Sequence, residues 1–402
     1  MRLTIVNQFY LPDLSPTAHL AASLAEHRAT VGDQVTVIAG SGAYAAGQAA
    51  GKSGDRANLR LLRIWTPSLG KSNALRRLVD YTIFFGQAGW ALLTLPKQDV
   101  ILLMTTPPYI ALTGLLHRLI HRRSRLVLWS MDCYPETLER AGIIRPGGPT
   151  SRRLRGLNRW LFRRLNAVVC LDEAMRRMLE QSYAVRGHPR HVVIPNWEPA
   201  AMFPPGLTPP TWEGVDRLGL QGRQVVLYLG NAGAGHRFDT LLQAGKRLPA
   251  AEHAFVFIGG GSAWPALRAA RDSEGLQNFI LEGYVPKEET TAILAAADAA
   301  LITLRDEMLG VMSPSKLHSA LAMGLPIVYL GPAGGNVHEA VGQFGCGVSL
   351  RHGDVEGLVG FLTRLRSEPA VLQEYARRAR QAYETAYSDV VGLARFDALL
   401  DT

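Results

Sequence analysis

Residues 311–331, VMSPSKLHSALAMGLPIVYLG, decide what the sequence predicts for the second half of this chain. Ser313 is a favoured helix N-cap residue, and Pro314 suits the first helical position because its missing N–H costs nothing there. Gly324 suits a left-handed C-cap, and the IVYL run after Pro326 is typical of a buried strand. The stretch therefore predicts a helix that ends at Gly324, followed by a strand.

The start of this helix is a candidate anion site. Unpaired backbone N–H groups and the positive end of the helix dipole lie together at a helix N-terminus. Lys316 adds an ammonium group, so Ser313, Ser315 and Lys316 are candidate phosphate ligands. An ordinary capped helix with a solvated lysine is an alternative that this stretch alone leaves open.

Alternating strand and helix patterns run outward from this stretch over the whole chain. Repeated βα units predict parallel sheets covered by helices on both faces, so the expected fold class is α/β. The candidate strands are residues 3–6, 34–39, 59–65, 100–104, 125–130 and 167–171 in the first half, and 225–230, 254–260, 279–285, 299–304, 326–331 and 347–350 in the second.

Chain length and a proline-rich stretch predict two domains. A chain of 402 residues exceeds the usual size of one core, and residues 194–212, IPNWEPAAMFPPGLTPPTW, suit a linker. We expect Rossmann-like domains at residues 1–200 and 201–368, facing each other across a cleft with ligands at the carboxyl ends of the strands. Residues 369–402 are expected to form a helical segment that packs back on the first domain.

Charge is spread unevenly along the chain. Residues 1–200 carry 26 Lys and Arg against 13 Asp and Glu, which favours an anionic partner for that half. Residues 151–166 hold six Arg interrupted by aromatic residues. This pattern is typical of a basic amphipathic helix that binds an anionic membrane surface. The alternative is a helix whose charged face is solvated and whose apolar face packs in the core. Residues 83–95 are apolar but too short to span a bilayer, so they predict a core or an interfacial helix. Without a recognition motif, we do not expect nucleic acid as a partner.

Two features of the sequence indicate the cellular compartment: its three cysteines and its first residues. Their odd number and the lack of a CxxC pair argue against a disulfide framework or a zinc site and suit a reducing cytoplasm. The chain runs from Met1 straight into a strand, so no signal peptide is expected. We therefore expect a cytoplasmic protein that is peripheral on the inner face of the plasma membrane.

Further candidate site residues follow predicted strands. In the loop after residues 225–230, Gly233 and Gly235 permit close approach of a phosphate, and a tight turn that needs positive φ is the alternative. Asp132 follows residues 125–130 and could bind sugar hydroxyls or receive a proton, whereas a helix cap before Tyr134 is the alternative.

The order of several motifs resembles that of the retaining GT-B glycosyltransferases of family 4, especially the bacterial surface-polysaccharide branch. The similarity covers nearly the whole length. It is carried by QFYLPDLSPTAHLAASLAE (8–26), TTPPYIALTG (105–114), WSMDCYPETLERAGIIRPG (129–147), VIPN (193–196), LYLGNAGAGHRFDTLLQA (227–244), GYVPKEETTAILAAADAALITL (283–304), PSKLHSALAMGLPIV (314–328) and GCGV (345–348).

This resemblance implies transfer of a sugar from a nucleoside diphosphate sugar, expected to be a UDP-sugar, with retention of configuration and without a metal or cofactor. The acceptor would be a lipid-linked or growing surface glycan. The base would lie against Tyr284 and Val285. The implied donor-binding residues are Asn231, Gly233, Gly235, His236, Tyr284, Val285, Glu307, Ser313, Ser315, Lys316, Gly335 and Glu339. The implied acceptor-binding residues are Asp13, Ser15 and Thr17, and the implied catalytic residues are Asp132 and Lys316.

The sequence departs from the family pattern at charged positions. Val311 and Ser319 stand where relatives carry a pair of glutamates, and Glu307 is the nearest acid that could replace the sugar-binding one. His236 and a glycine-rich loop replace an Arg and a Lys, so Lys316 must carry more of the phosphate charge. Two rival functions remain: a GT-B sugar-nucleotide epimerase, and a non-catalytic nucleotide-sugar-binding subunit docked at the membrane.

Overall fold

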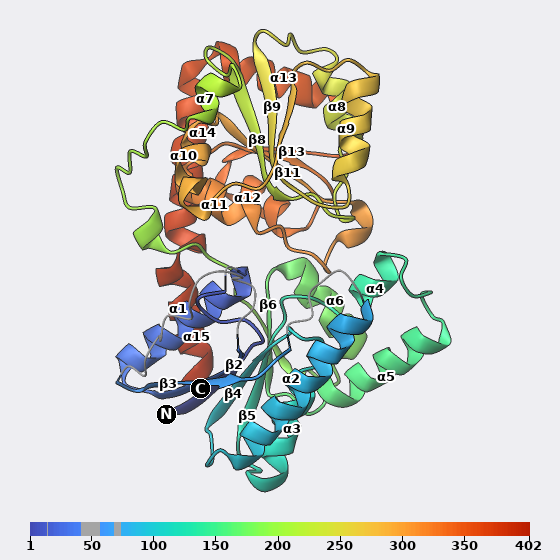
Figure 1. The fold of residues 1–402 in the computed structure, drawn as a ribbon, viewed down its shortest axis with the longest axis vertical. Coiled ribbons are helices and arrows are strands. Elements are labelled where there is room, and N and C mark those ends of the chain that lie inside the picture. The colour runs from blue at the N-terminus through green and yellow to red at the C-terminus, as the bar shows by residue number, and fades with distance from the viewer. Residues whose placement is uncertain (14, 42–56, 68–73) are drawn as a thin grey trace. The chain divides into compact units, whose positions relative to one another are not determined.

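A computed structural model describes residues 1–13, 15–41, 57–67 and 74–402 (Figure 1). The chain divides into two compact units. Unit 1 comprises Met1–Leu171, Met175–Pro195 and Leu393–Thr402, and unit 2 comprises Asp172–Ala174 and Asn196–Gly392.

Unit 1 is built on a parallel sheet of seven strands in the order β3-β2-β1-β4-β5-β6-β7. The strand order reverses between β1 and β4, which makes their carboxyl ends the expected ligand-binding edge. The strands are β1 (Arg2–Val6), β2 (Gln34–Gly40), β3 (Leu59–Ile64), β4 (Val100–Met104), β5 (Arg125–Trp129), β6 (Ala167–Cys170) and β7 (Arg190–Val193). The helices are α1 (Pro16–Val31), α2 (Ala74–Thr94), α3 (Ala111–Ile120), α4 (Glu136–Arg140), α5 (Pro149–Phe162) and α6 (Glu173–Tyr183).

Unit 2 is built on a parallel sheet of six strands in the order β10-β9-β8-β11-β12-β13. The strands are β8 (Gln224–Asn231), β9 (His253–Gly260), β10 (Phe279–Glu282), β11 (Ala299–Thr303), β12 (Ile327–Leu330) and β13 (Gly347–Leu350). The α-helices are α7 (Gly214–Arg217), α8 (Asp239–Gly245), α9 (Trp264–Ser273), α10 (Thr290–Ala295), α11 (Lys316–Met323), α12 (Asn336–Phe344), α13 (Val355–Ser367) and α14 (Pro369–Ala382). Helix α15 (Asp389–Leu400) begins in unit 2, and its residues from Leu393 onward belong to unit 1. Short turns are η1 (Ala200–Met202), η2 (Lys287–Glu289), η3 (Asp306–Met308) and the π-helical η4 (Tyr383–Tyr387).

Burial along the strands explains why these runs form sheets covered by helices. Every residue of β4 and of β11 is buried, as expected for strands that are covered on both faces. In unit 2 the aromatic rings of Tyr228, Phe255 and Phe257 belong to the core beneath α8 and α13. All twelve expected strands are present, so the predicted α/β class with parallel sheets is confirmed.

Some expected element boundaries were wrong. Strand β7 was missed, because its four residues form a half-buried edge with little apolar signal. The strand expected at residues 279–285 ends at Glu282, so Tyr284 and Val285 lie beyond it. Neither Ser313 nor Pro314 begins α11: Ser315 is its N-cap, without a side-chain cap hydrogen bond, although Gly324 is left-handed at the C-cap as expected.

The late start of α11 follows from the turn before it. The N–H groups of Val311 and Met312 both donate to the carbonyl oxygen of Met308, so the chain is still turning there. The first turn of the helix is formed by the N–H groups of Leu317 and His318, which donate to the carbonyl oxygens of Pro314 and Ser315. The N-terminal end of the helix, where the sequence predicts an anion site, is therefore at Ser315 and Lys316.

The C-terminal segment expected at residues 369–402 is divided between the units. Residues 369–392 belong to unit 2, and only Leu393–Thr402 belongs to unit 1. In unit 1 the Phe396 ring packs against Trp129, with ring centroids 4.5 Å apart. The Arg125 guanidinium donates to the carbonyl oxygens of Leu399 and Leu400. The last ten residues thus complete the core of unit 1.

Candidate functional site

The carboxyl ends of β8 and β11 form the candidate donor site of unit 2. These two strands are neighbours, and the strand order runs away from them in opposite directions. In open α/β sheets, ligands bind at such a switch point, outside the carboxyl ends of the strands. Asn231 ends β8 and Thr303 ends β11, and the loop of residues 232–238 connects β8 to α8.

The glycines of this loop are required by close packing and not by a positive φ. Gly233 and Gly235 are absent from the residues with positive φ, so the tight-turn alternative does not apply to them. A Cβ on Gly235 would lie 2.5 Å from the Sδ atom of Met312, which packs directly against the loop. On the neighbouring strand, a Cβ on Gly259 would lie 2.3 Å from the carbonyl oxygen of Gly230. Neighbouring atoms therefore occupy the place that a side chain would take at Gly235 and at Gly259.

Lys316 points back from the start of α11 to the end of β8. Its Nζ donates to the carbonyl oxygen of Asn231 at 3.3 Å and lies 4.6 Å from the centre of the Tyr228 ring. Burial lowers the pKa of Lys316 to about 8, so it remains mostly cationic at neutral pH. The N–H groups of Ser315 and Lys316 have no partner among the described residues. An ammonium group and two free N–H donors thus converge where an anion is favoured.

His236 lies beside this lysine at the end of the loop. Its Nδ1 is 2.7 Å from the carbonyl oxygen of Thr303, and a carbonyl only accepts, so Nδ1 carries the proton and donates. Burial, and then the positive charge of Lys316, lower the pKa of His236 to about 4. The imidazole is therefore neutral, with a lone pair on Nε2.

The remaining predicted donor residues follow neighbouring strands. Tyr284 is 74% exposed, and its ring lies against the backbone of Gly260, where a Cβ would be 2.9 Å from Cε2. Gly335 is the N-cap of α12, and Glu339 is in the first turn of that helix. Ser313 lies in the turn before α11, and Val285 follows Tyr284 beyond β10.

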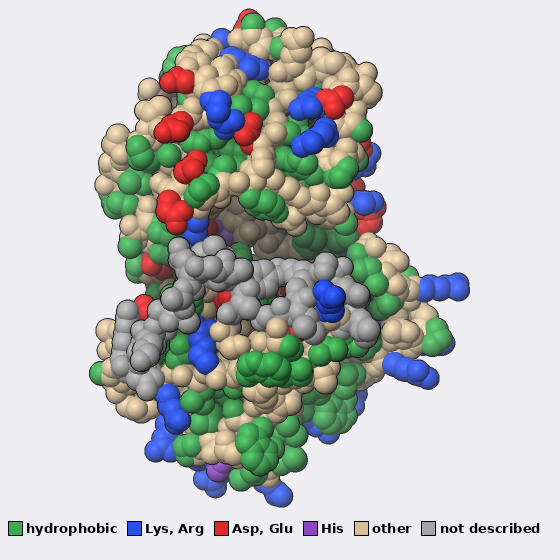
Figure 2. Space-filling view, in the orientation of Figure 1, with side chains coloured by type: hydrophobic (Ala, Val, Ile, Leu, Met, Phe, Trp, Pro, Cys, Tyr) green, Lys and Arg blue, Asp and Glu red, His purple; other side chains and the backbone are tan. Residues whose placement is uncertain are grey.

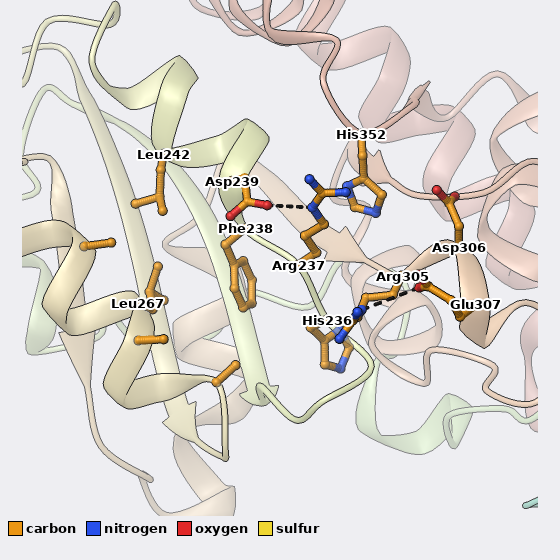
Figure 3. A pocket seen from close by; sticks show the side chains of 13 residues that line it. His236, Arg237, Phe238, Asp239, Leu242, Leu267, Arg305, Asp306, Glu307 and His352 are labelled. Carbon is orange, nitrogen blue, oxygen red and sulfur yellow. Dashed lines mark hydrogen bonds and ion pairs between the residues drawn. The ribbon is translucent and has the colours of Figure 1, made fainter. Parts of the chain in front are cut away.

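A cavity of about 430 Å³ adjoins His236 on the side of α8 and α9 (Figure 3). Figure 3 shows charged side chains at one end of it and apolar side chains at the other. Glu307 lines this cavity and forms an ion pair with Arg305 at 3.5 Å. The lining residues are His236, Arg237, Phe238, Asp239, Leu242, Ala263, Ala266, Leu267, Ala270, Arg305, Asp306, Glu307 and His352.

Asp132 lies at the carboxyl end of β5 in unit 1, as its position in the sequence predicts. The Oγ1 atom of Thr105, which follows β4, accepts the N–H groups of both Met131 and Asp132 at 2.9 Å. Burial raises the pKa of Asp132 above its ordinary value. Pro135 is the N-cap of α4, which has no side-chain cap bond, so the helix-cap alternative for Asp132 is wrong.

The three predicted acceptor-binding residues have structural contacts. Asp13 is 1% exposed, and one of its carboxylate oxygens accepts the N–H of Tyr10. Ser15 caps α1, because its Oγ accepts the N–H of Ala18 at 3.2 Å, and the Thr17 hydroxyl lies 3.2 Å from that Oγ. These contacts give Asp13 and Ser15 a role in holding the β1–α1 loop.

Sequence reasoning missed Thr105 and Tyr228 as parts of these sites. Thr105 follows β4 just as Asp132 follows the neighbouring β5, so the parallel strand order was the signal that could have found it. Tyr228 looked like any buried strand residue, and only the packing of Lys316 on its ring marks it.

The described residues show neither a metal-binding cluster nor a membrane-spanning helix. Among the described residues, no three His, Cys, Asp or Glu side chains are grouped so that they could hold a metal ion. Within the same part of the chain, no helix has the length and apolarity needed to cross a bilayer.

Comparison with known proteins identifies both units. Residues 17–197 match the family model "Glycosyl transferase 4-like domain", and residues 223–368 match "Glycosyl transferases group 1". The probable glycosyltransferase WbjE of Pseudomonas aeruginosa is 25% identical over 310 residues, which are 75% of this chain and 74% of WbjE.

Solved glycosyltransferase structures share the fold. Anabaena HepE in complex with UDP and glucose is 14% identical, with a TM-score of 0.71 over 100% of this chain and 99% of HepE. WaaG, a glycosyltransferase involved in lipopolysaccharide biosynthesis, is 16% identical, with a TM-score of 0.66 over 98% of this chain and 99% of WaaG. The chain therefore consists of a glycosyltransferase 4-like domain followed by a glycosyl transferases group 1 domain, and it is a glycosyltransferase with the GT-B fold.

Proposed function

We propose that this protein transfers a hexosyl or N-acetylhexosaminyl group from a UDP-sugar to a lipid-linked or growing surface glycan, with retention of configuration. The observation that carries the donor half is the buried ammonium of Lys316 beside two free N–H groups and a bare glycine loop. A diphosphate has the charge and the size for that arrangement. HepE, which shares the fold, is described in complex with UDP and glucose.

The charges suggest how the transfer proceeds. When the bond between the anomeric carbon and the diphosphate oxygen breaks, its electron pair goes to that oxygen. Lys316 and the α11 N-terminus stabilise the negative charge that develops there. The acceptor hydroxyl forms the new bond on the same face of the sugar and gives its proton to the departing diphosphate. Asp132, in unit 1, binds the acceptor and orients its hydroxyl.

Replacement of Lys316 tests the donor site. Lys316→Ala should weaken the binding of UDP by about 1.5–3 kcal/mol, which is the range for a lost charge-assisted contact, and should leave uridine binding nearly unchanged. Lys246→Ala removes a lysine that pairs with Glu274 at 3.1 Å and is the matched control. Equal losses for UDP and uridine in calorimetry would refute the phosphate role of Lys316.

Donor turnover separates this function from its two rivals. An epimerase changes the sugar of the nucleotide sugar without any acceptor, so product analysis with donor alone would reveal it. A non-catalytic binding subunit would bind UDP but show no turnover with any acceptor. The transferase requires both the donor and an acceptor glycan.

We further propose that the protein is peripheral on the inner face of the plasma membrane. The supporting observation is a surface of unit 1 with exposed apolar and basic side chains, formed by α2, the end of α3 and α5, which we call the membrane-facing surface in this proposal. Its exposed apolar side chains include Trp90, which is 69% exposed, and Leu119, which is 72% exposed. Figure 2 shows hydrophobic side chains gathered over α2 and α3, with Lys and Arg side chains around them.

Contacts within unit 1 make these helices neighbours. A Cβ on Gly89 of α2 would lie 2.9 Å from a methyl carbon of Leu116 on α3, so α2 packs closely against α3. The Arg118 guanidinium on α3 donates to the carbonyl oxygen of Arg164, just beyond α5. Arg164 in turn lies 4.1 Å from the centre of the exposed Trp160 ring. The expected stretches at residues 83–95 and 151–166 are thus linked through α3.

The chemistry of the membrane-facing surface suits an anionic bilayer. Tryptophan rings sit at the interface between lipid and water, and each nearby basic residue adds about 1 kcal/mol of attraction to anionic lipid. Arg155 does not contribute, because it pairs with the buried carboxylates of Glu136 and Glu139. The exposed arginines on or directly beside this surface are Arg122, Arg123, Arg152, Arg153, Arg159, Arg163 and Arg164.

A further inference from the structure

The imidazole of His236 is held in one position by the last residue of β11. The fully buried Thr303 accepts the Nδ1–H of His236 on its carbonyl oxygen at 2.7 Å. Its hydroxyl donates to the carbonyl oxygen of Arg237 at 2.7 Å. The ring also meets the edge of Tyr228, with centroids 5.7 Å apart and an interplanar angle of 84°. The tautomer and the orientation of the ring are therefore fixed before any ligand arrives.

This environment makes His236 an acceptor of hydrogen bonds and not a cation. Burial and the neighbouring Lys316 both disfavour its protonation, and the pKa of about 4 leaves it neutral at physiological pH. Its Nε2 has no hydrogen-bond partner in the part of the chain that the structure describes. A neutral ring with a free lone pair binds hydroxyl groups, whereas a phosphate needs donors.

The other polar groups around the cavity are already engaged. The carboxylates of the cavity pair with arginines: Asp239 with Arg237 at 2.6 Å, Glu307 with Arg305 at 3.5 Å, and Asp306 with Arg351 at 3.1 Å. The second histidine of the cavity, His352, donates through Nε2 to the carbonyl oxygen of Leu304, and its Nδ1 is enclosed. A paired carboxylate can still accept further hydrogen bonds, but its charge is shared with an arginine. Among the described lining residues, the Nε2 of His236 is the neutral side-chain acceptor that is held in one orientation, has no partner and is not enclosed.

We propose that Nε2 of His236 accepts a hydrogen bond from a hydroxyl group of the donor sugar. This inference rests on the proposed function, because Lys316 then marks the position of the diphosphate. The sugar is bonded directly to the diphosphate, so its hydroxyl groups fall beside the lysine, where His236 lies. His236 thus recognises the sugar, and Lys316 recognises the phosphates.

Two substitutions of His236 distinguish the role of Nδ1 from that of Nε2. His236→Asn keeps an N–H near the Nδ1 position for Thr303 but removes the group at Nε2. His236→Gln places an amide oxygen near the Nε2 position. Calorimetry would compare UDP with one of three UDP-sugars (UDP-glucose, UDP-galactose or UDP-N-acetylglucosamine), chosen as the one that the wild-type protein binds most tightly.

The expected result is a loss specific to the sugar. His236→Asn should bind UDP within about twofold of wild type and the UDP-sugar about tenfold more weakly, since a hydrogen bond contributes roughly a factor of ten. His236→Gln should recover most of that loss. Equal weakening for UDP and the UDP-sugar, or no change in His236→Asn, would overturn the proposal.

A second measurement needs no variant and is independent of folding. In the wild-type protein, the affinity for the UDP-sugar should be compared with the affinity for the β-methyl ester of UDP, whose diphosphate carries the same charge, and this ratio should stay constant from pH 6 to pH 9, because His236 does not titrate there. A ratio that falls as the pH drops through 6.5 would show a titrating imidazole at the sugar and would contradict the assignment. Failure of wild type to bind UDP at all would instead refute the proposed function.

Discussion

The Nζ atom of Lys316 lies 4.6 Å from the centre of the Tyr228 ring. The ring supplies a favourable electrostatic contact for a cation that burial otherwise penalises. The lysine is thus kept close to β8, where it faces the same loop backbone that would receive a phosphate. In the proposed function its charge holds the diphosphate, and its lowered pKa brings the loss of that charge into an accessible pH range.

We predict that UDP affinity falls as the pH rises above 8. The cationic form of Lys316 binds the diphosphate, and with a pKa of about 8 in the free protein the lysine loses its proton above that pH. From pH 7 to pH 9 the affinity should fall by up to about tenfold, which corresponds to one linked proton. Lys316→Ala should show a flat profile in calorimetry over this range. Parallel profiles for the two proteins would show that another group is responsible.

Asp132→Asn should lower kcat while leaving the fold and UDP binding unchanged. The substitution keeps the shape of the side chain and the two N–H contacts to Thr105, but it removes the charge at the acceptor side. If Asp132 handles the acceptor hydroxyl, the fall should be about 10²- to 10⁴-fold. Ser124→Ala, a change at a buried hydroxyl remote from the end of β5, serves as control. A near-normal rate would leave Asp132 with a structural role only.

Turnover should survive treatment with EDTA. No cluster of three metal-ligating side chains occurs in the described residues, and Lys316 with the α11 N-terminus supplies the positive charge that the diphosphate needs. The rate should therefore stay within about twofold after chelation, which is a barrier change of less than ~0.5 kcal/mol. A rate that collapses with EDTA and returns with Mn²⁺ or Mg²⁺ would contradict the account of a lysine and a helix dipole.

The protein should sediment with vesicles that contain phosphatidylglycerol at low salt and be released at high salt, because salt screens exposed charges. Replacing Arg152, Arg153, Arg159 and Arg163 with Gln should reduce sedimentation while leaving UDP binding intact. The matched control replaces four exposed arginines of unit 2, namely Arg217, Arg247, Arg364 and Arg377. Trp90→Ser should also weaken sedimentation at low salt, because it removes an exposed aromatic side chain of this surface. If the wild-type protein does not sediment with these vesicles at low salt, the proposal that this surface binds the membrane is wrong.

Arg28→Ala should destabilise unit 1. The Arg28 side chain is 3% exposed and forms ion pairs with Asp33 at 2.6 Å, Asp397 at 2.8 Å and Asp401 at 2.6 Å. Removing it leaves the buried Asp33 without this partner and takes away the contacts that Arg28 makes with Asp397 and Asp401 of the C-terminal segment, at a cost of about 3–5 kcal/mol. Urea unfolding would measure this loss. Arg364→Ala, which breaks an exposed pair, should cost less than about 1 kcal/mol, and equal losses would contradict the burial argument.

The sequence by itself determined which segments form the two sheets and where the candidate site residues lie along the helices and strands. Runs such as IVYL and VILLM form buried strands because β-branched and aliphatic side chains fit a covered sheet, and the left-handed cap at Gly324 depends on that residue alone. The placement of Lys316 in the first turn of a helix, and of Asp132 after a strand, also follows from local pattern.

Only the tertiary structure decided the chemistry of these residues. The start of α11 was moved by a turn at Met308, and the protonation of His236 depends on Thr303, a residue of another strand. Arg155 looked like its exposed neighbours until Glu136 and Glu139 were found beside it. The pKa and the tautomer of a side chain depend on its burial and on partners that are distant in the sequence. Local residue patterns predict neither the burial nor these partners.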